Sequence, residues 1–258
     1  MRPHLINNLR MLSARIDRSL LYAAEDLPLA VEIETNTQCT RSCFYCLKRR
    51  NNEGILETDL FYSVIDQLQQ WGFRGRLFPH SFNEPLTDER MLQFLSYASR
   101  KLPQCEIILH TNGDLLTLEG IRSFIANGAS QISVSLHDPV STGLEGKIKN
   151  FCRQFRCVTT VDMRDHKRDV PLFNRGGSIA LKGVQSLKRC YLVDIMVIKA
   201  DGNVVLCCQD SMGQYTFGNA GNQPIRNIWE MEDFKMIRKE VRNGKFKLPI
   251  CRQCGYIF

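Results

Sequence analysis

Two hydrophobic periodicities, one helical and one typical of strands, alternate along most of the chain. Apolar side chains recur three and four positions apart in four stretches, which predicts helices over residues 58–71, 88–101, 117–127 and 143–155. Short β-rich stretches lie between them, and they predict strands at 29–35, 76–82, 106–111, 131–136 and 157–162. Because a strand, a helix and the next strand connect by right-handed crossovers, the pattern predicts a parallel sheet.

The number of these units limits the architecture. A complete eightfold barrel takes about 250 residues, and only five or six units fit before residue 185. We therefore expect an α/β fold, in which residues 28–185 form an open, partial (β/α) barrel of five to six parallel strands.

The rhythm changes near residue 186. Residues 195–198 and 204–206 flank Asp201-Gly202-Asn203, which predicts a hairpin, and residues 227–242 predict one last helix. A region with so small a core usually needs a covalent or metal staple. We therefore expect a small hairpin-plus-helix domain over 186–258, and a helical N-terminal extension over 1–27.

Composition excludes several classes of protein. The chain has 258 residues, with 34 Lys and Arg against 27 Asp and Glu, a formal net charge of +7. No apolar run approaches the roughly 20 residues that cross a bilayer, and no signal-peptide core is present, so we expect a cytoplasmic protein without a membrane partner. The densest basic patch, Lys48-Arg49-Arg50, lacks interleaved aromatic residues. That patch favours a solvated loop or an anion-binding edge over nucleic-acid binding.

The 11 cysteines are the most informative residues. Without a secretion signal they favour metal binding over disulfides. Cys39, Cys43 and Cys46 form a C-x3-C-x2-C motif in the loop after the first strand, where parallel α/β proteins place their chemistry. Three thiolates can hold three irons of a cubane and leave the fourth iron open to a ligand. A structural zinc loop is the alternative.

A second group of cysteines lies near the C-terminus, at Cys190, Cys207 or Cys208, Cys251 and Cys254. Four thiolates suit a fully protein-bound cluster, and they equally suit a zinc staple. Neighbouring residues of a strand point in opposite directions, so we expect only one of Cys207 and Cys208 to be a ligand, and the hairpin favours Cys207.

The first motif, with Tyr45 just before its last cysteine, resembles the radical S-adenosylmethionine (SAM) superfamily. Asn83-Glu84-Pro85, Thr111-Asn112-Gly113 and Ser133–Leu136 follow at successive strand ends, although Phe82-Asn83 replaces the usual two glycines. The resemblance implies an open iron that binds SAM and supports cleavage to a 5′-deoxyadenosyl radical. It also implies SAM contacts at Tyr45, Asn83, Glu84, Thr111, Asn112 and Ser135.

The second cysteine group resembles the twitch domain, a shortened relative of SPASM, which implies two [4Fe–4S] clusters in all. Residues 28–258 resemble the twitch-bearing aminocyclitol dehydrogenases of aminoglycoside antibiotic biosynthesis, on motifs that include Asn174-Arg175-Gly176-Gly177. This resemblance implies oxidation of a secondary alcohol of an amino sugar or aminocyclitol, with the auxiliary cluster as electron acceptor. It further implies contact between Arg175 and the substrate hydroxyl, and a flavodoxin- or ferredoxin-type electron donor.

Three further groups have alternative interpretations. His110 shares strand parity with Asn112, so it faces either the cavity, as a substrate ligand or base, or the core. Cys208 is a candidate hydrogen-atom donor, which would make the protein an epimerase. Glu32 and Glu34 need a partner if buried, either an internal cation or a cationic substrate. A peptide-modifying enzyme and a zinc-stapled binding module are the remaining alternatives.

Overall fold

The computed structural model describes residues 27–46, 54–137, 142–164 and 167–257. The helix expected in the N-terminal extension and the basic patch Lys48-Arg49-Arg50 lie outside these ranges. None of the described helices is long and apolar enough to cross a membrane.

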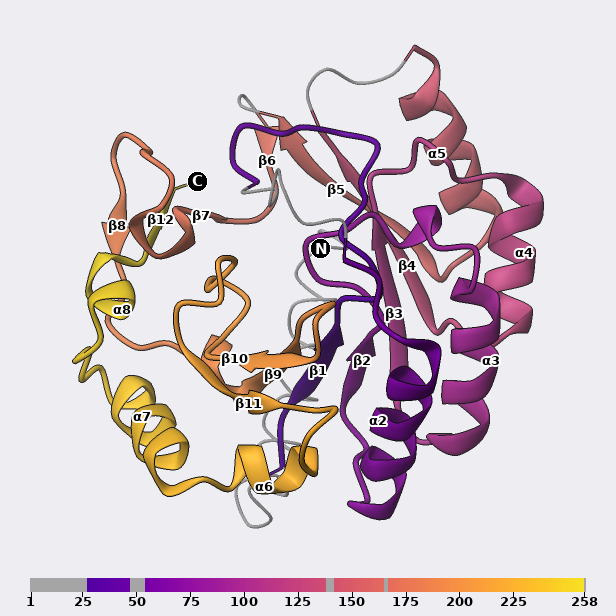
Figure 1. The fold of residues 1–258 in the computed structure, drawn as a ribbon. Coiled ribbons are helices and arrows are strands. Elements are labelled where there is room, and N and C mark those ends of the chain that lie inside the picture. The colour runs from indigo at the N-terminus through magenta and orange to yellow at the C-terminus, as the bar shows by residue number, and fades with distance from the viewer. Residues whose placement is uncertain (1–26, 47–53, 138–141, 165–166, 258) are drawn as a thin grey trace.

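One nine-stranded sheet organises the molecule, in the order β11-β10-β9-β1-β2-β3-β4-β5-β6 (Figure 1). Its six central strands are parallel: β9 (Ile195–Ile198), β1 (Ala30–Ile33), β2 (Arg76–Phe78), β3 (Glu106–Thr111), β4 (Gln131–Leu136) and β5 (Val158–Arg164). Antiparallel strands continue it at both edges, namely β6 (Lys167–Arg168), β10 (Asn203–Val205) and β11 (Thr216–Asn219). The predicted partial barrel of five to six parallel strands is confirmed.

The helices α2 (Thr58–Gln70), α3 (Met91–Lys101), α4 (Leu118–Ala126) and α5 (Leu144–Gln154) lie together along one side of the sheet (Figure 1). Each of them buries one apolar face. In α2 this face is Phe61, Val64, Ile65 and Leu68, at the spacing that predicted the helix. These side chains share one core with Val31 and Leu77 of the strands. The helical layer leaves the carboxyl ends of the parallel strands free to form a site.

Strand β2 is shorter than expected, because it ends at Phe78 and not at residue 82. Pro79 follows at once and has no N–H to donate. The neighbouring strand β3 satisfies its amide differently: the His110 N–H donates to Nε2 of the His80 side chain over 2.9 Å. A side chain thus replaces a backbone carbonyl, and residues 79–84 are released toward the strand ends.

The single last helix expected over 227–242 is wrong. The chain forms α6 (Ile225–Trp229) and α7 (Glu232–Arg242), and a further helix α8 (Pro249–Gln253) follows. Met231 between the first two is extended, with φ −54° and ψ 133°. This bend sets Phe234 edge-on to Trp229, with ring centroids 5.3 Å apart. Aromatic packing in the core therefore outweighs continuation of the helix.

The last strand, β12 (Gly255–Ile257), lies between β7 (Leu172–Phe173) and β8 (Gln185–Ser186) in a separate three-stranded sheet. Strand β9, on the other hand, pairs with β1 in the main sheet. The C-terminal part of the chain therefore contributes strands to both sheets, and it packs closely on the elements before it.

Candidate functional site

A cavity of about 280 Å³ opens at the carboxyl ends of the parallel strands. Its lining comes from the loop after β1, from the ends of β2, β3 and β4, and from residues after β5. The cavity contains nine of the predicted site residues: Cys39, Cys43, Tyr45, Cys46, Asn83, Glu84, Thr111, Asn112 and Ser135. His110 and Arg175, both predicted to meet the substrate, also line it.

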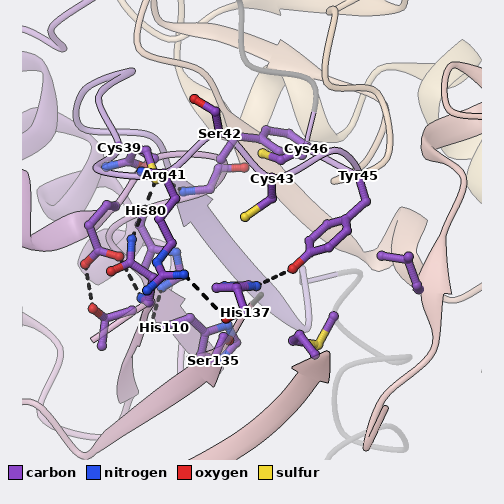
Figure 2. A pocket seen from close by; sticks show the side chains of 18 of the residues that line it. Cys39, Arg41, Ser42, Cys43, Tyr45, Cys46, His80, His110, Ser135 and His137 are labelled. Carbon is purple, nitrogen blue, oxygen red and sulfur yellow. Dashed lines mark hydrogen bonds between the residues drawn. The ribbon is translucent and has the colours of Figure 1, made fainter. Parts of the chain in front are cut away.

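The three cysteines of the first motif project from one loop, residues 39–46, which we term the cluster loop (Figure 2). All three side chains are partly exposed to the cavity. The Cys39 sulfur accepts from the Arg41 N–H at 3.4 Å and from Asn112 Nδ2 at 3.7 Å. Three thiols and no carboxylate among the loop's own side chains suit an iron–sulfur cluster bound at three corners.

A bidentate ion pair fixes the cluster loop to the end of β3. Arg41 donates from Nε to Asp114 Oδ2 at 2.7 Å and from Nη2 to Oδ1 at 2.6 Å. Beside it, Asn112 Nδ2 donates to Thr40 Oγ1 at 2.9 Å. Both partners of the ion pair are largely shielded, with side-chain exposures of 11% and 20%. Two charge-assisted bonds with planar geometry orient the loop as well as attach it.

A second attachment joins the cluster loop to β4. The Tyr45 hydroxyl makes a short hydrogen bond with Nδ1 of His137, the residue after that strand (Figure 2). Burial first, and then the charge of Arg41, lower the pKa of His137 to about 4. A neutral imidazole can accept a hydrogen bond from the phenol hydroxyl, so Tyr45 is held against the cavity wall.

Glu84 has its carboxylate committed to the protein. It accepts from Thr111 Oγ1 at 2.6 Å, from the Asn112 N–H at 2.7 Å and from the Leu86 N–H at 3.3 Å. Burial raises the pKa of Glu84, and the Thr111 hydrogen bond opposes the rise. Glu84 thus joins the end of β3 to the turn after β2. Its contact with a SAM amine stays a prediction, as does that of Asn83, which bonds Asn36 at 3.1 Å.

His110 and His80 both line the cavity, with ring centroids 5.3 Å apart, and His80 is the buried one of the two. Burial lowers the pKa of His110, and it lowers that of His80 to about 3. Both rings are therefore neutral near pH 7. A neutral His110 offers one acceptor or one donor to a polar ligand.

Arg175 enters the cavity from a strained turn. Its φ is +51°, which non-glycine residues rarely adopt. The guanidinium lies 5.0 Å from the Phe82 ring centroid, and Nη1 donates to Gln209 Oε1 at 3.4 Å. Its Nε is buried without a hydrogen-bond partner among the described residues. Since the Arg175 side chain also lines the cavity, its guanidinium fits the predicted contact with a substrate hydroxyl.

The two glutamates of β1 have different surroundings. Glu34 forms a buried ion pair with Lys199 at 2.9 Å, which is the internal cation that the sequence suggested. Glu32 accepts from Ser81 Oγ at 3.0 Å. Burial raises its pKa to about 7, although Ser81 and the charges of Arg175 and Lys199 oppose the rise.

Cys208, the predicted hydrogen-atom donor, lies within electrostatic reach of Glu32 and Arg175. Burial first, and then Glu32, raise the pKa of this thiol, so it stays protonated. Cys208 lines neither of the two described cavities. Cys105, Cys152 and Cys157 pack partly buried against the hydrophobic core.

Cys190, Cys207, Cys251 and Cys254 surround a second, narrow cavity with aliphatic walls. Cys207 and Cys254 are the buried pair, and burial raises the pKa of Cys254 to about 11. Since Cys207 lines this cavity and Cys208 does not, the arrangement supports Cys207 as the fourth ligand. Four thiols in a dry environment fit a fully ligated iron–sulfur cluster.

The spacing of the side chains bears on the zinc alternative. Within the described ranges, no three His, Cys, Asp or Glu side chains are close enough to hold a single metal ion. Four thiolates around one zinc must each lie about 2.3 Å from it, whereas a cubane holds its ligands farther apart. The described residues therefore do not assemble a mononuclear zinc site at either cysteine group.

The sequence did not point to Arg41, His80, Asp114 or His137. Each is polar and follows a strand closely, so the position of strand ends was the available signal. Their partners were not readable, because each partner comes from a different strand end.

Known proteins resemble this chain over most of its length. The iron–sulfur cluster-binding domain family SPASM matches residues 190–255. The S-adenosyl-L-methionine-dependent 2-deoxy-scyllo-inosamine dehydrogenase of Niallia circulans is 28% identical over 236 residues, which covers 88% of this chain and 92% of that protein. Over most of its length, this chain is therefore similar to a SAM-dependent dehydrogenase that carries a SPASM-type domain.

Solved structures extend the likeness to the fold of the chain. BtrN in complex with AdoMet and 2-DOIA superposes with a TM-score of 0.80 at 27% identity, covering 88% of this chain and 93% of that chain. anSMEcpe with bound AdoMet gives a TM-score of 0.57 at 12% identity, with 86% and 84% covered, which shows a shared fold alone. Residues 190–255 therefore match an iron–sulfur cluster-binding domain, and most of the chain has the fold of an enzyme solved with bound AdoMet.

Proposed function

We propose that this protein is a radical SAM dehydrogenase that oxidises a secondary alcohol of an aminocyclitol or amino sugar to a ketone. The observation that carries the proposal is that Arg175 lines the cavity of the cluster loop and, through Gln209, also reaches the wall of the second cysteine cavity. Substrate, SAM and an electron acceptor can thus meet around one arginine. The similarity to 2-deoxy-scyllo-inosamine dehydrogenase supports the substrate class.

The cluster loop would hold the first [4Fe–4S] cluster through Cys39, Cys43 and Cys46. Cys190, Cys207, Cys251 and Cys254 would hold the auxiliary one. When bound, SAM and the first cluster supply a 5′-deoxyadenosyl radical, and the auxiliary cluster supplies a one-electron acceptor. Tyr45, Thr111, Asn112 and Ser135 line the same cavity and are our proposed SAM contacts.

The chain's own residues would position the alcohol and exclude water. The Arg175 guanidinium lines the cavity and can donate to the substrate hydroxyl, while Phe82, Met163 and Phe173 form an apolar wall. A dry, fixed geometry keeps a carbon radical from side reactions. His110, neutral and exposed to the cavity, is our proposed second polar contact with the substrate.

The oxidation balances with these components. The C–H bond of the carbinol carbon breaks, and its hydrogen atom goes to the deoxyadenosyl carbon. The hydroxyl proton leaves as H⁺, the remaining electron goes to the acceptor, and a C=O bond results. The electron that cleaves SAM comes from a reductant, for which we propose a flavodoxin- or ferredoxin-type protein. A cytoplasmic, reducing location is part of the same proposal, because the thiolates must stay reduced.

An epimerase is the second candidate, and the protonated state of Cys208, not its exposure to the cavity, supports it. This protonated thiol lies near Glu32 and Arg175, so it is a possible hydrogen-atom donor to a substrate radical. In that reaction the donor returns a hydrogen atom to the same carbon, and the product has the mass of the substrate.

Anaerobic turnover with reductant, SAM and 2-deoxy-scyllo-inosamine in deuterated water separates the candidates. We expect 5′-deoxyadenosine and a ketone two hydrogens lighter than the substrate, with no deuterium on the oxidised carbon. Carbon-bound deuterium in a product of inverted configuration would establish the epimerase. Protein purified without oxygen that contains zinc and no iron would refute both.

A further inference from the structure

The turn that carries Arg175 is attached directly to a pair of the auxiliary cysteines. This turn, residues 174–177, is termed here the arginine turn, and residues 251–254, with Cys251 and Cys254, the knuckle. Nδ2 of Asn174 donates to the Gln253 carbonyl at 2.9 Å, and its Oδ1 accepts from the Gly255 N–H at 2.9 Å. The Asn174 N–H donates to the Gly255 carbonyl at 2.9 Å.

These three hydrogen bonds lie on both sides of Cys254. Asn174 is only 6% exposed and Cys254 only 8%, so water cannot replace the bonds at low cost. The amide uses both its donor and its acceptor, a combination that an aspartate lacks. Strand pairing continues the attachment, since β12 after the knuckle pairs with β7 before the turn.

The two segments also fit closely without side chains between them. A Cβ on Gly176, whose φ is +62°, would lie 2.2 Å from Ile250 Cγ1. A Cβ on Gly177, with φ +90°, would lie 2.7 Å from Gln253 Oε1. Left-handed backbone and absent side chains therefore let the arginine turn lie directly against α8.

The arginine turn touches a cluster ligand itself. The Gly176 backbone amide lies close enough to the Cys254 thiol to oppose the rise that burial gives its pKa, and backbone amides near ligand sulfurs are among the features that set the potential of iron–sulfur clusters. On the neighbouring residue, Arg175 reaches the first cavity and bonds Gln209, which lines the second one. One short turn thus lies against the substrate cavity and against the auxiliary site.

We propose that Asn174 is a positioning residue that joins the knuckle and the arginine turn into one unit, so that the auxiliary cluster and Arg175 hold each other in place. The inference rests on the proposed function for the role of Arg175, and it adds a coupling between two sites. Such coupling is reciprocal. If the assembled auxiliary site increases the affinity for substrate by some factor, bound substrate stabilises the auxiliary site by the same factor.

Two measurements test the coupling without substrate. In Asn174→Asp we expect a changed reduction potential and EPR signature of the auxiliary cluster, while SAM cleavage in the absence of substrate stays within about twofold of wild type. In Cys254→Ser we expect faster amide hydrogen exchange over residues 172–178. An unchanged auxiliary signature in Asn174→Asp, or unchanged exchange in Cys254→Ser, would overturn the proposal.

Matched variants separate coupling from general damage. Asn127→Ala removes one side-chain bond to a carbonyl, 2.8 Å long, at the end of α4, and we expect it to change neither readout. Arg175→Lys should weaken substrate binding and leave the auxiliary signature as in wild type. If Arg175→Lys alters that signature as strongly as Asn174→Asp does, the arginine and not Asn174 controls the site.

A third measurement uses 2-deoxy-scyllo-inosamine as the probe. Coupling energies in proteins usually correspond to a 5- to 150-fold change in affinity. We expect the probe to bind about tenfold more weakly to Asn174→Asp, and wild-type affinity there would contradict the coupling. Failure of wild type to bind the probe would count against the proposed substrate, and the first two measurements would still decide the role of Asn174.

Discussion

The two cysteine sites of this chain are built in opposite ways. The first site takes its three thiols from one loop of consecutive residues, 39–46, and presents them partly exposed to an open cavity. The second takes four thiols from three separate segments and encloses them among aliphatic side chains. An open site must bind and release ligands, whereas a closed one has only to hold a cluster. Local sequence is thus enough to bring the thiols of the first site together, whereas the thiols of the second site meet only through tertiary packing.

The sharpest way to break this comparison is to remove one thiol from each site. In Cys43→Ala we expect loss of all SAM cleavage, because the open iron depends on the three-thiol loop. In Cys254→Ala we expect SAM cleavage to persist while ketone formation falls more than a hundredfold. Both variants should drop from about eight irons per chain to about four, measured by anaerobic iron and sulfide analysis. Equal loss of SAM cleavage in the two variants would show that the sites are not independent.

The next largest effect should come from the attachment of the cluster loop. Arg41→Ala leaves the Asp114 carboxylate, only 20% exposed, without its bidentate partner. Loss of one member of a buried ion pair lowers the free energy of unfolding by several kcal/mol, and loss from a partly exposed pair lowers it less. We therefore expect Arg41→Ala to lower the free energy of unfolding by about 2 kcal/mol. Calorimetric titration with SAM should show affinity about tenfold weaker. Adding Asp114→Asn to Arg41→Ala should restore part of the SAM affinity. If the two substitutions instead weaken SAM binding additively, the two side chains do not interact directly.

Glu32 lies between the two sites and gives a pH-dependent test. Its pKa is raised by burial from 4.5 to about 7. Between these values the folded state binds more protons than the unfolded state, so this group contributes stability below pH 4.5 that is lost as pH rises toward 7. As the pH is raised from 5 to 8, the free energy of unfolding should therefore fall less in Glu32→Gln than in wild type. We expect the two decreases to differ by about 1–3 kcal/mol. Parallel melting profiles for the two proteins would show that Glu32 titrates normally.

The smallest effect concerns the other attachment of the cluster loop. Tyr45→Phe keeps the ring and removes the hydroxyl that bonds Nδ1 of His137. A single neutral hydrogen bond contributes about 1 kcal/mol, so we expect SAM to bind a few-fold more weakly, with the auxiliary EPR signature unaltered. His137→Phe is the matching change on the opposite partner and should give the same result. Unaltered SAM affinity in both variants would mean that this bond does not position the loop.

Sequence patterns predicted the elements that local physics decides. Strands β3 and β4 and the hairpin strand β9 have the predicted bounds, since alternation and flanking turns define a strand locally. The C-x3-C-x2-C motif was likewise readable, because all its members lie within one loop. Repeated strand–helix units were sufficient to predict a partial barrel.

Features that depend on distant partners were not readable in the same way. The early end of β2 depends on His80 replacing a backbone acceptor of β3, and the split between α6 and α7 depends on how Phe234 packs on Trp229. The pairing of Arg41 with Asp114 joins residues that are neighbours only after two crossovers have formed. The role of Asn174 needs β12 to return between β7 and β8. Hydrophobic periodicity does not indicate which distant residues come into contact in the folded chain.

The place of β1 in the main sheet has a consequence for how the chain reaches its native state. Its partner on one side is β2, but on the other side Ala30 pairs with Ile195 of β9. Until that distant segment arrives, a strand next to the cluster loop keeps one row of amides and carbonyls open to other chains. Contacts of such long sequence separation form slowly. The exposed edge of β1 can therefore pair with other chains until β9 pairs with it.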